Sequence, residues 1–395
     1  MGSSLFQNNS RAGRWEKQSG PEPYSCFIPS PLPPQPSIHY TSTLQGLAER
    51  ASHALGRLDG IVTHLPNPAL LLYAYVRKEA VLSSQIEGTQ SSLSDLLLFE
   101  NKQAPGVPMD DVKEVSNYVA ALEHGMKRLK SGFPLSLRLM REIHAVLLKG
   151  GRGSDKLPGE FRCSQNWVGG SRPGNAIYVP PPAHEVLPAM GALEKFIHGE
   201  PVQTPTLIKA GLAHAQFESI HPFLDGNGRL GRLLIPFILH VEGALTHPFL
   251  YLSLHFKENR QYYYEVLQDV RKKGNWEKWL DFYLEGIEKV SNQACDTITK
   301  LTGMFEQHRK RIKGIGRASD SALGFFELMK KRCVVSLTVA QKELKVSFPT
   351  ANKAVSNLQE LGFVKEITGR RRDRVFSYEP YLKILQTGTE KPGDL

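Results

Sequence analysis

Residues 221–232 read HPFLDGNGRLGR, and this stretch is the most informative part of the sequence about the fold of the chain. It follows an amphipathic helical run at roughly residues 205–220 and leads into an apolar run at residues 233–241. Glycine allows a tight turn between two such runs, because it adopts positive φ without a steric penalty. The pattern predicts a helix-loop-helix junction in which Gly226, Asn227 and Gly228 open the second helix.

The turn has the features of an anion site. Free N–H groups at a helix N-terminus attract negative charge, and Gly226 and Gly228 would bring bare amides close to a ligand. Arg229 and Arg232 lie three residues apart, on one helical face. Because arginine grips phosphate oxygens bidentately, this set predicts a cradle for nucleotide phosphates.

Asp225 and His221 would supply the chemistry beside the cradle. A carboxylate such as Asp225 is a hard oxygen ligand suited to a Mg²⁺ ion that also bridges phosphates. His221 is neutral near pH 7 and can accept a proton. The alternative is a plain helix junction with a glycine cap and surface arginines.

The stretch resembles the core motif of Fic-domain proteins, HPFx(D/E)GNGRxxR, at every specified position. The resemblance implies a mainly α fold and Mg²⁺-dependent transfer of AMP from ATP to a protein Ser, Thr or Tyr hydroxyl. It makes His221 the general base and Asp225 the metal ligand. Doc-type relatives that transfer phosphate carry lysine where this chain has Gly228, which favours AMP transfer. Phosphocholine-transferring relatives keep a similar motif, so the motif alone leaves the donor open.

The same resemblance assigns the phosphate ligands. Asn227 and the amides of Gly226 and Gly228 correspond to the cradle of the α- and β-phosphates. Arg229 would help to hold the phosphates, and Arg232 would bind the γ-phosphate.

A second motif lies upstream, where residues 75–88 read YVRKEAVLSSQIEG. The spacing predicts a short helix with Gly88 as its C-terminal cap. Glu87 then faces the negative end of the helix dipole, which breaks a local rule and hints at a role elsewhere. The alternative is an ordinary solvated surface glutamate.

Residues 83–88 also match (S/T)xxxE(G/N), the inhibitory motif of Fic proteins, with Ser83 as its first residue. The resemblance implies that Glu87 pairs with Arg232. One arginine cannot serve a carboxylate and a γ-phosphate at once, so Glu87 would hold the enzyme inactive. Whether Glu87 also positions water to remove AMP is left open.

Residues 166–182, NWVGGSRPGNAIYVPPP, predict a β-hairpin that the resemblance places over the active site as a flap. Main-chain groups of the flap would align the target segment. The residues assigned to this role are Trp167, Val168, Gly169, Ile177 and Tyr178. A purely structural hairpin is the alternative.

Residues 258–275 predict the helix that walls the adenine in relatives. Tyr264 and Leu267 lie three residues apart on one face of it and are the adenine-pocket candidates. A Tyr/Leu pair at this spacing is equally typical of ordinary core. Trp276 and Trp279 are expected to be core.

The amino-acid composition indicates the class of protein and its compartment. The 395 residues are 41% hydrophobic and 22% charged, as in a globular protein, with no apolar run long enough to span a membrane. The N-terminus has no apolar segment of a secretory signal. Four scattered cysteines without a CxxC pair favour reduced thiols and a cytoplasmic location, and no histidine spacing suggests zinc.

The expected organisation has five parts. They are a proline-rich extended arm (1–40), a helical region with the inhibitory helix (41–112), the Fic core with its small hairpin flap (113–286), a helical connector (287–316) and a C-terminal domain (317–395).

The sequence of residues 317–395 predicts the order helix, helix, turn, helix and hairpin. This order resembles a winged helix-turn-helix domain of α+β type. Residues 301–395 hold 18 Lys and Arg against 10 Asp and Glu, a net charge of +8 of the +10 on the whole chain. By the likeness, Thr350, Asn352, Lys353 and Ser356 would face a DNA major groove, and the arginines at 370–372 would meet phosphates. Dimerisation or protein binding are the alternatives for this domain.

The favoured function is thus a self-restrained protein adenylyltransferase whose target is another protein or the chain itself, with ATP and Mg²⁺ as its small partners. The competing function is a DNA-binding transcriptional regulator that keeps the Fic core as a nucleotide sensor. A homodimer would be compatible with both, and no residue pattern here defines its interface or the target.

Overall fold

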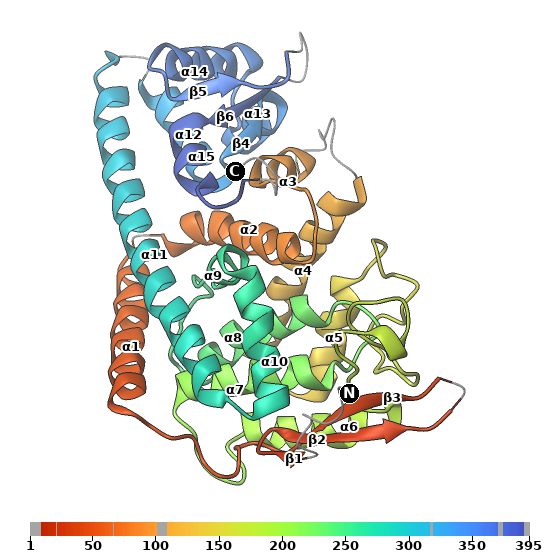
Figure 1. The fold of residues 1–395 in the computed structure, drawn as a ribbon. Coiled ribbons are helices and arrows are strands. Elements are labelled where there is room, and N and C mark those ends of the chain that lie inside the picture. Colours follow the sequence, from red (N-terminus) through yellow and green to blue (C-terminus); the bar gives the residue numbers. More distant parts are fainter. Residues whose placement is uncertain are drawn as a thin grey trace.

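The structure is a computed structural model that describes residues 9–20, 22–65, 67–100, 109–316, 319–369 and 374–390. It is mainly helical, with two small antiparallel sheets, as Figure 1 shows. The helices are α1 (Ser42–Thr63), α2 (Pro68–Ile86), α3 (Leu93–Glu100), α4 (Met109–Lys130), α5 (Leu137–Leu147), α6 (Ala183–Ile197), α7 (Thr206–Ile220), α8 (Asn227–Val241), α9 (Ser253–Glu258), α10 (Arg260–Lys273), α11 (Trp276–Lys313), α12 (Ser319–Arg332), α13 (Leu337–Leu344), α14 (Phe348–Glu360) and α15 (Glu379–Gln386). The strands are β1 (Asn9–Ser10), β2 (Gly13–Gln18), β3 (Tyr24–Pro29), β4 (Val334–Ser336), β5 (Val364–Glu366) and β6 (Val375–Tyr378).

The predicted helix-loop-helix junction is formed by α7 and α8, which pack against each other at the centre of the fold. The expectation of an amphipathic first helix was wrong, because every side chain of α7 from Leu207 onward is buried. Two of its polar side chains, Lys209 and His214, are paired within the protein. The Lys209 ammonium lies 2.6 Å from the Glu242 carboxylate, and His214 hydrogen-bonds to the Gly231 carbonyl and the Tyr263 hydroxyl.

The helix α2, which carries the upstream motif, is longer than predicted. It begins at Pro68, where the fixed φ of proline suits the first helical turn. It ends at Ile86, with Glu87 as the C-cap residue and Gly88 at φ +99°. The cap was therefore predicted correctly, and it fixes where the Glu87 side chain leaves the helix.

The N-terminal arm contains strands that the sequence analysis missed. The strands β1, β2 and β3 form one antiparallel sheet in place of a wholly extended arm. Phe27 and Ile28 of β3 are buried, and the Phe27 amide donates to the Val179 carbonyl at 2.9 Å. The arm thus lies on the body, as expected, and it contacts the end of the predicted flap segment.

The predicted connector is not a separate element. The helix α11 is continuous over 38 residues, from its contacts with α7 and α10 to its contacts with the C-terminal helices α12 and α15. In Figure 1 it runs along one side of the molecule beside α1 and reaches α12. Trp276 and Trp279 at its start are buried, as predicted.

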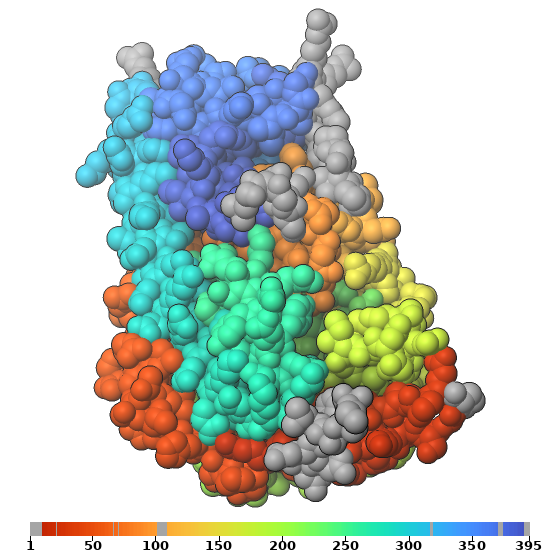
Figure 2. Space-filling view, viewed as in Figure 1, coloured from red at the N-terminus to blue at the C-terminus, as the bar shows by residue number. Residues whose placement is uncertain are grey.

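The C-terminal module, defined here as the described residues from Ser319 to Glu390, has the sheet order β4-β6-β5. The predicted helices correspond to α12, α13 and α14, and the predicted hairpin to β5 and β6. The strand β4 and the helix α15 were missed, and the arginines at 370–372 lie outside the described residues. The module packs on α2 and α3 (Figures 1 and 2), so it touches the helix that carries Glu87.

One contact joins the module to the upstream motif itself. The Gln85 side-chain amide donates to the carbonyls of Thr389 at 3.2 Å and Ser91 at 3.0 Å. Among the described residues, no helix is both long enough and apolar enough to cross a membrane. The four cysteines are unpaired, with Cys163 alone exposed.

Candidate functional site

The loop between α7 and α8 is held in place by a buried arginine and an asparagine. Arg162 donates from its Nε to the His221 carbonyl at 3.0 Å and from its Nη2 to the Pro181 carbonyl at 2.5 Å. Asn166 donates to the Phe223 carbonyl at 2.8 Å. These bonds support His221 at φ +49°, a backbone conformation that residues other than glycine rarely adopt. Backbone strain of this kind gathers at functional sites.

His221 is a neutral imidazole in this setting. Burial, together with the nearby Arg271 and Arg162 guanidinium groups, lowers its pKa to about 3 against the opposing charge of Glu87. The ring is therefore ready to accept a proton across the physiological pH range, as the sequence analysis expected.

His221 stands where two cavities meet. One cavity of about 450 Å³ is lined by His221, Arg232 and the predicted adenine-pocket residues. A smaller one of about 110 Å³ lies over the turn and is lined by Asp225, Gly226 and Arg229. Both also touch Glu87 and Gly228. A neutral base therefore lies between a pocket wide enough for a nucleoside and an amide-lined hollow.

The structure gives the Asn227 side chain a different use from the one expected. Its carbonyl oxygen accepts from the Phe223 amide at 2.9 Å, and its amide donates to the Phe223 carbonyl at 2.8 Å. Both ends of the side chain are thus committed to the loop. Asn227 shapes the cradle, and only its backbone amide is left for an anion at the helix N-terminus.

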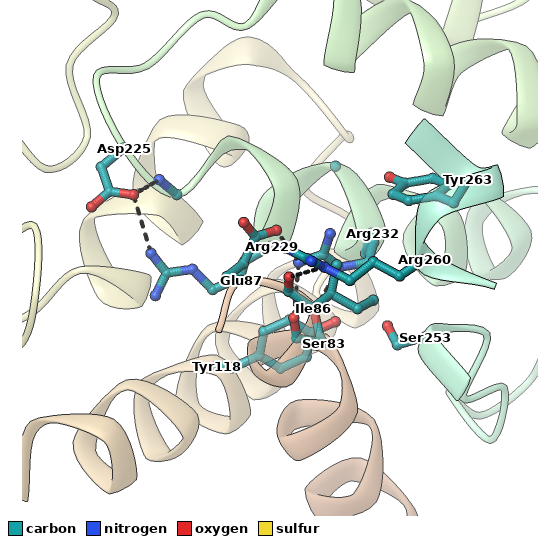
Figure 3. Close-up of polar contacts among 12 residues, drawn as sticks. Ser83, Ile86, Glu87, Tyr118, Asp225, Arg229, Arg232, Ser253, Arg260 and Tyr263 are labelled. Carbon is teal, nitrogen blue, oxygen red and sulfur yellow. Dashed lines mark hydrogen bonds and ion pairs between the residues drawn. The ribbon is translucent and has the colours of Figure 1, made fainter. Parts of the chain in front are cut away.

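The predicted pair of Glu87 and Arg232 is present (Figure 3). The Arg232 Nη2 lies 2.7 Å from the Glu87 Oε1, and the same guanidinium donates to the Ser83 hydroxyl at 2.8 Å and to the Ser83 carbonyl at 3.0 Å. Burial raises the pKa of Glu87, but the Arg232 charge outweighs it and leaves this pKa below its ordinary value. Glu87 is therefore ionised and paired.

Gly228 permits this approach. A Cβ at position 228 would lie 2.3 Å from the Glu87 Oε1 and 3.0 Å from an Arg232 nitrogen. Any side chain here would collide with the ion pair. The residue predicted to offer a bare amide thus also makes room for Glu87.

Arg229 is held by carboxylates of the protein. Its Nη1 lies 2.9 Å from the Glu114 Oε1 and its Nη2 lies 3.5 Å from the Asp225 Oδ1, and both Arg229 and Glu114 are buried. Arg229 also lines the smaller cavity. Its contribution to the cavity is thus mainly a fixed positive charge.

Asp225 suits a metal that is shared with phosphates. Its Oδ1 accepts from the Gly226 amide at 2.6 Å, and its side chain is 30% exposed at the mouth of the smaller cavity. Among the described residues, no group of three or more His, Cys, Asp or Glu side chains could cage a metal. A single carboxylate beside an amide-lined hollow fits the coordination habits of Mg²⁺, which binds through one or two carboxylates together with substrate phosphates and water.

The predicted flap hairpin is reduced to a single bridge between Val168 and Tyr178. Trp167, Val168 and Ile177 are exposed, and Gly169 and Gly170 make the turn at positive φ. Tyr178 is buried instead, with its hydroxyl donating to the Ser219 carbonyl, so its side chain is an anchor and not a contact for a target.

Both adenine-pocket candidates line the larger cavity. Leu267 is buried there and Tyr264 is 40% exposed, on one face of α10. Arg260, Gln268 and Arg271 of the same helix line it too.

Some site residues gave no usable signal in the sequence. Glu114 lies far from the motif in the chain, and only the fold brings it there. Glu218 was passed over as part of a helix expected to be amphipathic, where a glutamate reads as a solvated residue.

Comparisons with known proteins agree with this geometry. Residues 134–239 match the family described as Fic/DOC family, and residues 45–127 match Fic/DOC family N-terminal. A protein adenylyltransferase Fic of Aedes aegypti is 31% identical over 60% of this chain and 49% of its own length. Its Drosophila melanogaster counterpart is 29% identical over 63% and 51%. The chain spans about half the length of the curated relatives it matches.

Solved structures show the same fold at low identity. A Fic family protein from Desulfovibrio desulfuricans G20 superposes with a TM-score of 0.56 and 18% identity, covering 86% of this chain and 97% of that one. Fic-1 (residues 134–508) from C. elegans superposes with a TM-score of 0.51 and 22% identity, covering 65% and 74%.

Proposed function

From the premise that this chain carries a Fic/DOC domain and the N-terminal region of that family, we propose that it transfers AMP from ATP to a protein hydroxyl. The observation that carries the proposal is the position of the neutral His221 between the nucleoside-sized cavity and the amide-lined hollow. The names of the curated relatives support the same reaction.

The reaction follows from what each group can do. The amides at the start of α8 and the charge of Arg229 would hold the phosphates. His221 would take the proton of the incoming hydroxyl as its oxygen bonds to the α-phosphorus, and pyrophosphate would leave. Catalysis of phosphoryl chemistry of this kind is mostly positioning and charge stabilisation.

Glu87 is the proposed brake. While Arg232 holds the Glu87 carboxylate through its Nη2 and the Ser83 hydroxyl through its Nε, these two nitrogens would not be free to bind a γ-phosphate. The negative charge of Glu87 would also repel the phosphates, since it lines both cavities. ATP would then bind with its α-phosphate displaced from His221.

The brake is expected to be insensitive to pH near neutrality. The pKa of Glu87 lies below its ordinary value in the folded chain, so the pair with Arg232 is lost only as the pH falls through that lowered value. The ratio of transfer rates between Glu87→Gly and wild type should stay within about twofold from pH 6 to pH 8. Rates of both proteins in matched buffers test this, and a ratio that collapses toward pH 6 would contradict it.

Mg²⁺, when bound, would neutralise charge on the phosphates and orient them. Asp225→Asn should raise the Mg²⁺ concentration for half-maximal transfer at least roughly tenfold. A loss of about tenfold in metal affinity is the smallest effect typical of mutating a residue that only supports a metal ligand, and Asp225 would be a ligand itself. A Mg²⁺ titration of the transfer rate measures it. Asp155→Asn, an exposed change in the neighbouring loop, is the control and should leave the titration unchanged.

The direct test is incubation of the full chain with Mg²⁺ and α-labelled ATP, followed by intact mass. A gain of one AMP on the chain or on a protein of an added lysate supports the proposal. No labelled protein under either condition, with the brake removed, rejects it.

We propose in addition that the C-terminal module is a winged helix that binds DNA. Its order β4-β6-β5 around α13 and α14 supports this, as does the exposed Lys353 on α14. One observation qualifies the expected contacts, because the Asn352 side chain accepts from Arg374. His221→Ala separates the regulator from the transferase, since it should remove transfer and leave DNA binding intact.

A further inference from the structure

Glu218 presents a lone buried carboxylate to the larger cavity. It lies in the last turn of α7, one turn before His221, and is 7% exposed. Within the part of the chain that the structure describes, its carboxylate has no hydrogen-bond or ion-pair partner. Only its backbone carbonyl is used, accepting from Arg271 at 3.1 Å.

The fold makes room for this carboxylate. A Cβ on Gly231 of α8 would lie 2.4 Å from the Glu218 Oε1, so glycine at position 231 is what lets the carboxyl group sit between α7 and α8. The placement is therefore built by two helices and is not an accident of one flexible side chain.

Burying such a group without a partner destabilises the fold. Burial raises the pKa of Glu218 to about 7, against the opposing pull of Arg232. Buried polar groups are normally hydrogen-bonded, and an unpaired one on a cavity wall is a candidate for contact with a ligand.

The neighbours of Glu218 indicate which part of a nucleotide it would meet. His221 marks the end of the cavity where the phosphates would lie, and Leu267 marks the apolar end that suits a base. Glu218 borders the same cavity one helical turn from His221, with the buried Tyr263 close enough for its pKa to feel the carboxylate charge. The ribose lies between the phosphates and the base in any nucleotide, and carboxylates commonly hydrogen-bond ribose hydroxyls.

We infer that Glu218 accepts a hydrogen bond from the ribose hydroxyls of the bound nucleotide and makes the site select ribonucleotides. The inference rests on the proposed function, because it requires a nucleotide in this cavity. It assigns a specificity-determining role to a residue outside the core motif.

The test compares nucleotides by calorimetry in the Glu87→Gly background. ATP should bind at least roughly tenfold tighter than 2′-deoxy-ATP or 3′-deoxy-ATP, because the analogue leaves the carboxylate unpaired. Glu218→Ala should bring that ratio close to one. Gly231→Ala should do the same, since its methyl group displaces the carboxyl group. Glu285→Gln, an exposed change on α11, should leave the ratio unaltered.

Two further readouts separate recognition from a structural role. Glu218→Gln should melt at the same or a higher temperature at pH 8, because a folded-state pKa raised to about 7 means that the ionised carboxylate costs stability as the pH rises through it. In transfer assays, Glu218→Ala should raise KM for ATP much more than for 3′-deoxy-ATP or 2′-deoxy-ATP.

The outcomes are distinct. If Glu218→Ala keeps the preference for ATP over both deoxy analogues, the inference is wrong. If Glu218→Ala instead removes a preference for ATP over purine riboside triphosphate, which lacks the 6-amino group, Glu218 reads the base and the ribose assignment falls. If no nucleotide binds to Glu87→Gly at all, the proposed function fails together with the inference.

Discussion

Glu87→Gly is expected to raise the rate of AMP transfer by about a hundredfold, the size of effect that follows when one charged donor to a reacting anion is gained or lost. The structure supplies the reason. The Glu87 carboxylate occupies Arg232 at 2.7 Å and lines both cavities, so its removal frees a guanidinium and deletes a negative charge from the phosphate path. Initial rates with α-labelled ATP measure the gain.

A matched variant separates charge from shape. Glu87→Gln keeps the size of the side chain but loses the ion pair, and should give most of the gain. Without ATP, both variants should melt at a lower temperature than wild type, because Arg232 is left buried with only Ser83 as a partner. Added ATP should restore stability more in the variants than in wild type. Equal transfer rates in wild type and Glu87→Gly would show that Glu87 is no brake.

His221→Ala, made in the Glu87→Gly background, is expected to lower transfer by roughly 10²- to 10⁴-fold, the range typical of a lost general base. The neutral ring lines both cavities, and Arg162 and Asn166 hold the loop through the His221 carbonyl and not through its ring. The affinity for ATP should change little. Calorimetry and single-turnover transfer rates give the two quantities separately.

A neighbouring histidine provides the control. His144 is buried and stacks on Phe223, with a ring nitrogen 2.9 Å from the Asp225 carbonyl and another that accepts from the Gly159 amide. His144→Ala should therefore lower the melting temperature more than His221→Ala, because His144 is fully buried and both of its ring nitrogens are hydrogen-bonded. If His221→Ala retained transfer within threefold, another group would have to take the proton.

Local pattern was enough to predict the centre of the site. The junction, the turn at Gly226 and the pairing of Glu87 with Arg232 were all expected from short motifs and the resemblance that they carry. Tyr264 and Leu267, the predicted adenine-pocket pair, both line the larger cavity, and their role there stays a prediction. Such features depend on residues a few positions apart, whose geometry one helix or one turn determines.

What could not be predicted depends on contacts between distant segments. Nothing near Asn227 in the sequence shows that both ends of its side chain bond to Phe223, and nothing near Tyr178 shows that it is buried under the N-terminal arm. The full burial of α7 was not predicted either, because nothing in the sequence shows that a polar residue such as His214 is bonded to α8 and α10 instead of to solvent. The hydrophobic periodicity of a sequence indicates which face of a helix is buried. It does not indicate whether other elements cover the remaining faces.

Because α11 is one unbroken helix, its length determines the rotation of the C-terminal module about the helix axis. A helix advances about 1.5 Å and turns about 100° per residue, so one residue inserted in its middle would swing the C-terminal module around the helix axis and lift it from α2. The hydrogen bonds from Gln85 to the module would be broken by that rotation. Insertions of about seven residues nearly restore the phase but move the module by roughly 10 Å. A change in the length of α11 would therefore break the packing of the C-terminal module on α2. The module and the helices that it covers have to be treated as one unit in any redesign of the chain.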